Sequence, residues 1–185
     1  MARGPGVRST GAWRSDRLTL RPVGRADAGF VESLYASPDV TRTLLRIQGP
    51  ISTEQARDLC GTPVTASGEH RFLAVLRPNR RRVGLGTISR RAARPGVASV
   101  GYSVLPEFWG RGIGTALAAL LVEFAFGALA AIEVRATTLE DNLASTRVLE
   151  KLGFAVSDAD AREIDSRGDE RRVTRWSLRR GARDP

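Results

Sequence analysis

The sequence predicts a single mixed α/β domain in which a mostly antiparallel central sheet is flanked by helices. Its 185 residues suffice for one compact domain with a core of its own. Short apolar runs of strand length alternate with segments of helical periodicity. Neither an internal repeat nor a shift in composition divides the chain, so we expect no second domain.

The first third of the chain predicts one strand and two helices. Residues 17–22 (RLTLRP) alternate polar and apolar side chains and end at a proline, which is typical of a short strand. From Asp27 onwards apolar residues recur at helical spacing until Pro38 ends the helix. A weaker helical stretch begins at Ser52 and breaks near Gly61.

The middle of the chain predicts three strands of one sheet. Residues 72–76 and 83–89 are apolar runs on either side of a Pro-Asn turn, so we expect them to form a hairpin. Residues 97–105 follow Pro95 and Gly96 as a third strand of the same sheet.

Helices and strands alternate in the last third. Apolar residues recur on one face of a long helix that begins near Ile113. Residues 132–137 (IEVRAT) are a β-branched run, which predicts a buried strand. Residues 142–152 predict another helix that ends at a glycine. Two closing strands are expected at residues 154–156 and 172–178.

The composition indicates a soluble globular protein, with 42% hydrophobic and 26% charged residues. No apolar stretch approaches the roughly 20 residues that span a bilayer, so we expect no membrane partner. The single cysteine, Cys60, excludes an intrachain disulfide, and we expect a cytoplasmic location. Residues 1–15 lack the apolar core of a signal peptide and predict a flexible tail before a domain at residues 16–180, although a transit peptide has a similar composition.

The formal net charge of +9 raises the possibility of a nucleic-acid surface. The basic clusters at residues 77–82, 90–94 and 171–183 are scattered and are not interleaved with aromatic residues. We therefore expect no specific nucleic-acid binding. The charge would equally attract an anionic cofactor or an acidic partner.

Residues 100–117 (VGYSVLPEFWGRGIGTAL) join a predicted strand to a predicted helix through a glycine-rich turn. The three glycines permit tight packing and positive φ angles. Backbone N–H groups of residues 111–115 can then point into one concavity at a helix N-terminus, which suits a diphosphate. A tight strand-to-helix connection without a ligand would carry the same glycines.

Two better-known phosphate loops fit this turn less well. A P-loop ends in Gly-Lys, but Lys151 is the only lysine of the chain. A dinucleotide loop has a third glycine where Thr115 stands, and its acidic residue would be Glu133. The strands before the turn are expected to be antiparallel, which disfavours a dinucleotide fold.

Residues 142–154 (NLASTRVLEKLGF) begin with an amide and end in Gly-Phe. With RLTLRP near the start, SPDVTR at residues 37–42 and the glycine-rich segment, the chain resembles the GNAT superfamily of N-acyltransferases. Within that superfamily it is similar to the RimJ/RimL-like branch of ribosomal-protein N-terminal acetyltransferases. The resemblance covers about residues 17–154. It implies a single GNAT-type domain that moves an acetyl group from acetyl-CoA directly to a primary amine.

The resemblance also implies a set of cofactor contacts. The strand before the glycine turn would offer backbone groups to the pantetheine arm, the turn would bind the pyrophosphate, and the later helix would contact the rest of acetyl-CoA. An asparagine at its helix start equally suits a plain N-cap, and a basic helix face equally suits solvent. The implied cofactor-binding residues are Ser103, Val104, Arg111, Gly112, Gly114, Thr115, Asn142 and Arg147.

For the chemistry, the amine must lose a proton and the leaving thiolate must gain one. Many relatives place a tyrosine acid seven residues after the asparagine, where this chain has Leu149. Ser145 is the substitute that the branch implies, and Glu107, just before the turn, is the candidate base. A helix-face serine and a surface carboxylate are the ordinary interpretations of these two residues. No metal is expected.

The acceptor stays open between a protein N-terminus, which the branch favours, and a small-molecule amine. Two other kinds of function remain as alternatives. The absent tyrosine would suit a non-catalytic acyl-CoA-binding module, and the charge alone would suit a basic protein associated with RNA or the ribosome. A monomer and a homodimer are both compatible with the sequence.

Overall fold

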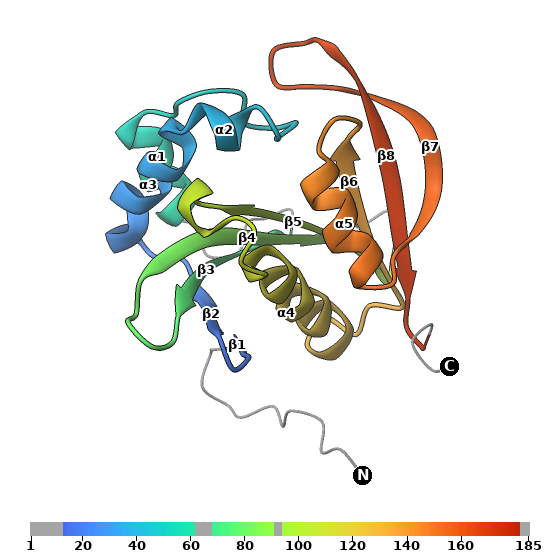
Figure 1. Ribbon diagram of the computed structural model, residues 1–185, viewed down its shortest axis with the longest axis horizontal. Helices are drawn as coiled ribbons and strands as arrows, with labels where there is room; N and C mark the ends of the chain where they lie inside the picture. The colour runs from blue at the N-terminus through green and yellow to red at the C-terminus, as the bar shows by residue number, and fades with distance from the viewer. Residues whose placement is uncertain (1–12, 62–67, 91–93, 182–185) are drawn as a thin grey trace.

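The computed structural model describes residues 13–61, 68–90 and 94–181. Its strands form one eight-stranded sheet in the order β1-β2-β3-β4-β5-β6-β8-β7, with helices on both faces (Figure 1). This mixed, mostly antiparallel arrangement confirms the predicted fold class. The strands are β1 (Trp13–Arg14), β2 (Leu18–Pro22), β3 (His70–Leu76), β4 (Arg82–Arg90), β5 (Val97–Val104), β6 (Glu133–Leu139), β7 (Ala155–Ile164) and β8 (Glu170–Arg179). The helices are η1 (Arg25–Asp27), α1 (Ala28–Ala36), α2 (Pro38–Thr41), α3 (Thr53–Gly61), η2 (Pro106–Phe108), α4 (Ile113–Gly127) and α5 (Leu143–Lys151).

The order of these elements differs from the prediction at three points. Pro38 ends α1 as expected but also starts α2, because proline is favoured in the first turn of a helix. β7 has 10 residues where only residues 154–156 were expected, since its exposed, polar sequence has little hydrophobic pattern. Trp13, within the predicted tail, belongs to β1 and packs edge-on against Phe124, with ring centroids 5.3 Å apart. Residues 1–12 of that tail lie outside the described residues.

The sheet opens between β5 and β6. These two strands pair in parallel, and their pairing runs only from Val97 opposite Glu133 to Ser99 opposite Arg135. Beyond Ser99 each strand continues without the other, and Figure 1 shows them heading in different directions. β6 pairs instead with β8 along its whole length. The second half of β5 therefore has one open edge.

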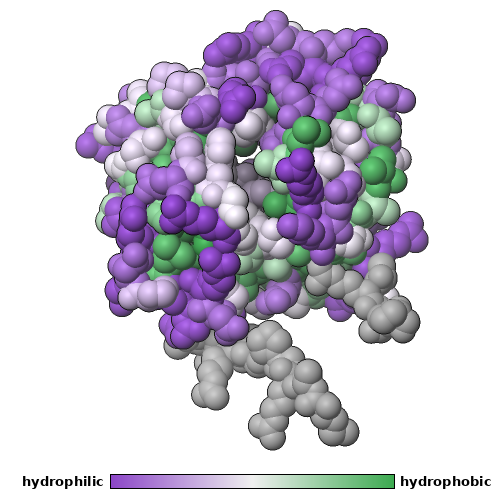
Figure 2. All heavy atoms as spheres, viewed as in Figure 1, coloured by the Kyte–Doolittle hydropathy of each residue, from purple (hydrophilic) through white to green (hydrophobic). Residues whose placement is uncertain are grey.

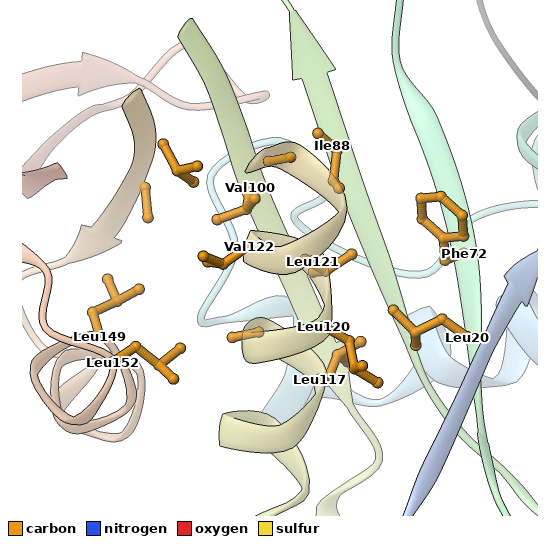
Figure 3. Packing of buried hydrophobic residues seen from close by; sticks show 14 of the residues in the cluster. Leu20, Phe72, Ile88, Val100, Leu117, Leu120, Leu121, Val122, Leu149 and Leu152 are labelled. Atoms are coloured by element: carbon orange, nitrogen blue, oxygen red, sulfur yellow. The ribbon is translucent and has the colours of Figure 1, made fainter. Parts of the chain in front are cut away.

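Helix α4 packs across one face of the sheet and forms the larger hydrophobic core. Leu117 and Leu121 of α4 are fully buried with Leu20 and Phe72 of the strands below (Figure 3). A Cβ atom at Gly86 would lie 2.8 Å from Leu121 Cδ2, so only glycine lets the helix approach β4 this closely. Truncating such a leucine to alanine costs about 2–5 kcal/mol. This packing fixes the position of the N-terminus of α4 at the end of β5.

A smaller core forms on the opposite face of the sheet. Val31 and Leu34 of α1 and Ala56 of α3 are buried with Leu85 of β4. Apolar residues on both faces of the central strands explain why those strands are near-continuous hydrophobic runs in the sequence. The two helices also form one wall beside the gap between β5 and β6.

Candidate functional site

The divergence of β5 and β6 leaves a cavity of about 470 Å³, within the usual range of small-molecule sites. Its walls are the second half of β5, the facing half of β6, the start of α5, and the segment that follows α2. Figure 2 shows the molecular surface hollowed between the regions of α2 and α5. Arg71 of β3 lines the same space as Asn142 and Ser145 at the start of α5, although the two elements are far apart in the sequence.

The open edge of β5 presents main-chain groups to this cavity. The N–H of Leu105 donates to the carbonyl of Val83 in β4 at 2.9 Å. Because main-chain groups of successive strand residues point to alternate sides, Tyr102 and Val104 direct theirs away from β4 and toward the gap. Ser103 directs its own groups toward β4. The main-chain direction therefore fits the contact predicted at Val104, and it favours Tyr102 rather than Ser103 as the neighbouring contact.

The side chain of Ser103 lies on the face of the sheet that α1 covers. Ser103 stands opposite Leu85 of β4, and its hydroxyl is close to that of Tyr35. Burial raises the pKa of Tyr35 to about 12, although the Ser103 hydroxyl acts to lower it. Both residues line the cavity, so Ser103 belongs to the site through its side chain.

Helix α4 begins at Gly112, whose φ of 74° and ψ of 5° are the left-handed conformation that glycine adopts most easily. No side chain caps this end, and the first N–H groups of a helix have no carbonyl within the helix. The N–H groups of Gly114 and Thr115 thus lie at a positive helix end that suits an anion. The indole N–H of Trp109 donates to the carbonyl of Val104 at 2.7 Å and fastens the turn to the end of β5.

Two arginines lie close to this helix start. Arg111 is exposed in the turn itself, as predicted. Arg17 comes from the turn before β2, and a Cβ on Gly112 would lie 3.2 Å from its Nη1 atom. In the described part of the chain no carboxylate pairs with Arg17. From the sequence, Arg17 is expected only as part of a strand, because no local pattern connects it with a turn about 95 residues later.

Helix α5 carries the predicted asparagine and serine at its start. The side chain of Asn142 accepts a hydrogen bond from the N–H of Ser145 at 3.1 Å, so Asn142 is the N-cap of this helix. Both residues also line the cavity. Leu149, at the position of the absent tyrosine, is buried and offers no proton. Arg147 is exposed and lies outside the cavity lining.

The predicted base and the predicted acid do not share this cavity. Glu107 lies in η2, is exposed, and forms an ion pair of 2.5 Å with Arg81. The lining instead includes Glu69, whose carboxylate lies 2.7 Å from the Arg71 guanidinium. Glu69 precedes β3 directly, and nothing in its local sequence distinguishes it from an ordinary loop carboxylate.

Tyr102 is a second residue of the site whose role no local sequence pattern indicates. A Cβ on Gly114 would lie 3.9 Å from Tyr102 Cε2 and 3.7 Å from Val148 Cγ2, so the ring packs between β5, α4 and α5. The hydroxyl is buried and has no hydrogen-bond partner among the described residues. Tyr102 also lines the cavity with Ser145. Its position in the middle of a strand with helices above is visible only in three dimensions.

Known proteins resemble this chain in sequence or in overall fold. An uncharacterized N-acetyltransferase of Bacillus subtilis, YoaA, is 29% identical over 143 residues, which are 76% of this chain and 80% of the relative. The spermidine N-acetyltransferase of Vibrio cholerae, solved with CoA and spermine, has a TM-score of 0.78 at 19% identity and covers 89% of this chain and 96% of that chain. A protein of Vibrio cholerae described as a ribosomal-protein-serine acetyltransferase has a TM-score of 0.73 at 18% identity, with 91% and 97% covered. The sequence profile of the GNAT acetyltransferase domain matches residues 17–155, and the chain therefore belongs to the GNAT acetyltransferase family.

Proposed function

We propose that this enzyme transfers an acetyl group from acetyl-CoA to the N-terminal amine of a protein or peptide, as members of the RimJ/RimL-like branch do. Family membership implies acyl-CoA-dependent N-acetylation and leaves the acceptor to be identified. The observation that carries the proposal is the cavity between β5 and β6, because it joins an open strand edge to Ser145 and to a carboxylate–arginine pair.

The residues around the gap fit acetyl-CoA. Tyr102 and Val104 offer main-chain groups to an extended pantetheine arm, which would lie beside β5 as an added strand. The N-terminus of α4 offers backbone donors to the pyrophosphate, and Arg111 and Arg17 add positive charge next to it. Asn142 remains our candidate for a contact to the pantetheine arm or the adenine side. The bound thioester would supply the activated acetyl group.

The chain's own groups then have to move two protons. Ser145 lines the cavity at the first turn of α5, and we propose that it donates a proton to the leaving sulfur. Glu69 lines the cavity whereas Glu107 does not, so we place Glu69 ahead of Glu107 as the base that takes the proton of the amine. Alignment of the two reactants in one cavity supplies a larger share of the rate than either proton transfer.

The charges beside the cavity favour an acceptor with little positive charge. A second cavity of about 650 Å³ adjoins the first, and the two share Arg46 and Arg71 in their walls. Its lining has three arginines against one aspartate; the charged residues are Arg46, Asp58, Arg71 and Arg167. A polyamine would bring several ammonium groups against these arginines, which Coulomb repulsion disfavours. A peptide with one N-terminal ammonium group and acidic residues behind it fits better.

A thiol-release assay with acetyl-CoA tests this proposal. We expect turnover with peptides that carry a free N-terminal serine or alanine followed by acidic residues. The same peptides with a blocked N-terminus are the matched control and should give only the background rate. Spermidine should be a poorer acceptor than the free peptides, and faster turnover with spermidine or with a small-molecule amine would move the assignment to that acceptor class.

Calorimetry with CoA separates the enzyme from a non-catalytic binding module. We expect CoA to bind and the free peptides to turn over. Binding of CoA without turnover of any tested amine would favour the non-catalytic binding module. Absence of CoA binding would contradict both the enzyme and the binding module.

A further inference from the structure

The hydroxyl of Tyr102 is a buried polar group without a partner. Tyr102 is half-buried, and its ring packs against the larger core close to Gly114 at the start of α4. The Tyr102 Oη atom has no hydrogen-bond partner in the part of the chain that the structure describes. The Ser145 hydroxyl is the neighbour that acts to lower the pKa of Tyr102 by hydrogen bonding, but the two hydroxyls do not meet the geometry of a normal hydrogen bond.

Such a group destabilises the protein unless something satisfies it. An unpaired buried donor costs about 1–3 kcal/mol, and native proteins retain few of them without a function. Burial raises the pKa of Tyr102 to about 12, against the lowering effect of the Ser145 hydroxyl. Tyr102 is therefore protonated at neutral pH and can only act there as a neutral hydroxyl.

Tyr102 lies beside the gap between β5 and β6. The main chain of Tyr102 faces the open edge of β5, and its side chain lines the same cavity as Ser145 and Asn142. A pantetheine arm that follows the edge of β5 would bring its terminal sulfur past this residue.

We propose that the Tyr102 hydroxyl donates a hydrogen bond to the sulfur of the CoA thioester bound in this gap and stabilises that sulfur as it leaves. This inference rests on the function proposed above. It assigns to a strand residue part of the role that relatives give to a tyrosine on the later helix, where this chain has Leu149.

The reaction balances without proton loss from Tyr102. The amine nitrogen forms a bond to the acetyl carbon, the carbon–sulfur bond breaks, and its electron pair moves onto the sulfur. The base takes the extra proton of the nitrogen, and Ser145 or water protonates the sulfur to give the CoA thiol. Tyr102 keeps its proton and stabilises the negative charge through its hydrogen bond.

The test is the pKa of the CoA thiol in the binary complex, followed by the ultraviolet absorbance of the thiolate. In the wild-type protein a hydrogen bond to the thiolate lowers this pKa. We expect Tyr102→Phe to raise the pKa of bound CoA by about one unit, which corresponds to a tenfold change in the thiolate equilibrium. Turnover with acetyl-CoA should fall about tenfold or more, because the negative charge on sulfur is largest as it leaves.

Ser157→Ala is the control, since it also removes one hydroxyl group but at a residue outside the cavity lining, where that hydroxyl donates to the carbonyl of Arg175. Ser157 lies on β7 at the far edge of the sheet, and its substitution should leave the pKa of bound CoA unchanged. Thermal unfolding without ligand supplies a second readout. Removing an unsatisfied hydroxyl should leave the melting temperature of Tyr102→Phe unchanged or raise it, whereas a structural hydrogen bond would lower it.

Three outcomes can be told apart. If wild type and Tyr102→Phe bind CoA with the same thiol pKa, or if Tyr102→Phe is clearly less stable than wild type, the assignment of Tyr102 is overturned. If the wild type does not bind CoA at all, the proposed function fails first. A raised thiol pKa in a stable Tyr102→Phe protein, with Ser157→Ala unchanged, supports the assignment.

Discussion

Gly114 lies where α4 comes closest to both β5 and α5. A Cβ at this residue would meet Val148 at 3.7 Å and Tyr102 at 3.9 Å, which are ordinary contact distances. The protein itself could therefore hold an alanine here. The N–H of Gly114 is one of the unpaired donors at the start of α4, and a methyl group beside it would hinder the approach of a bound phosphate.

We expect Gly114→Ala to weaken CoA binding at least about tenfold, or about 1.4 kcal/mol, while the protein becomes no less stable. Alanine favours a helix over glycine by up to about 1 kcal/mol, so the melting temperature should stay or rise. Gly29→Ala in α1 is the matched control, because a Cβ there meets no atom within 4 Å. Unchanged CoA affinity of Gly114→Ala in calorimetry would remove the start of α4 from the cofactor site.

Ser145 has a structural role through its main chain and a proposed catalytic role through its hydroxyl, and a substitution can separate the two roles. Its N–H bonds to Asn142 whatever the side chain is, so Ser145→Ala keeps the N-cap of α5. We expect turnover to fall about tenfold or more, with little change in acetyl-CoA affinity, since the lost interaction forms mainly in the transition state. Normal turnover in a single-turnover assay would leave Ser145 as a helix-face residue and assign proton delivery to water.

At the scale of elements, the side chain of Asp27 connects the ends of β2, η1, α1 and β4. Its carboxylate accepts two hydrogen bonds of 2.7 Å from Arg21 at the end of β2 and one of 3.0 Å from the N–H of Gly24. Arg82 of β4 approaches to 3.5 Å. Burial acts to raise the pKa of Asp27, but Arg21, the Gly24 N–H and Arg82 together hold it below its ordinary value. The ionised carboxylate thus anchors η1 and the start of α1 to the sheet.

This depressed pKa predicts an acid-dependent stability. The contribution of Asp27 is complete above the ordinary aspartate pKa of about 3.9 and is lost as the pH falls through the lower pKa of the folded protein. We expect Asp27→Asn to lower the free energy of unfolding at neutral pH by about 1–2 kcal/mol. This is less than for a fully buried pair, because Arg21 is 40% exposed.

Urea unfolding at pH 7 and pH 3 measures both effects. The difference between wild type and Asp27→Asn should shrink at the lower pH. Asp39→Asn is the control, since Asp39 is exposed and its ion pair with Arg42 spans 3.3 Å on the surface. An equal loss of stability in both variants would show that a general charge effect, not the buried carboxylate, is responsible.

At the scale of the whole molecule, the net charge of +9 does not collect into one surface. In the first and third basic clusters, arginines are joined to carboxylates: Arg81 to Glu107, Arg172 to Glu140, and Arg175 to Asp158 and Glu163. Among the described residues no helix combines the length and apolar character that a membrane crossing needs. The excess charge therefore gives a general attraction to anions.

We expect weak RNA binding that is insensitive to sequence and disappears by about 0.2 M salt, because released counterions drive it. Titration of a labelled RNA at several salt concentrations measures this, with an unrelated RNA of equal length as the control. Nanomolar binding of one RNA at 0.2 M salt would contradict the expectation and favour the alternative of an RNA- or ribosome-associated protein.

The sequence by itself determined most of the order of the elements and the left-handed start of α4. Both are local: an apolar face repeats along α4, a β-branched run forms β6, and Gly112 permits a left-handed helix start. The N-cap at Asn142 and the absence of an acid at Leu149 also follow from neighbouring residues. Short-range periodicity and turn chemistry suffice for such predictions.

Only the tertiary structure decided which groups meet at the site. Strand pairing sets which main-chain groups of β5 face the gap, and these are the groups of Tyr102 and Val104, whereas those of Ser103 face β4. Packing of separate elements brought Arg17 to Gly112 and Glu69 into the cavity, while Glu107 turned to Arg81 outside it. Contacts between distant segments depend on how the apolar faces of helices and strands pack against one another. The immediate sequence neighbours of a residue do not determine that packing.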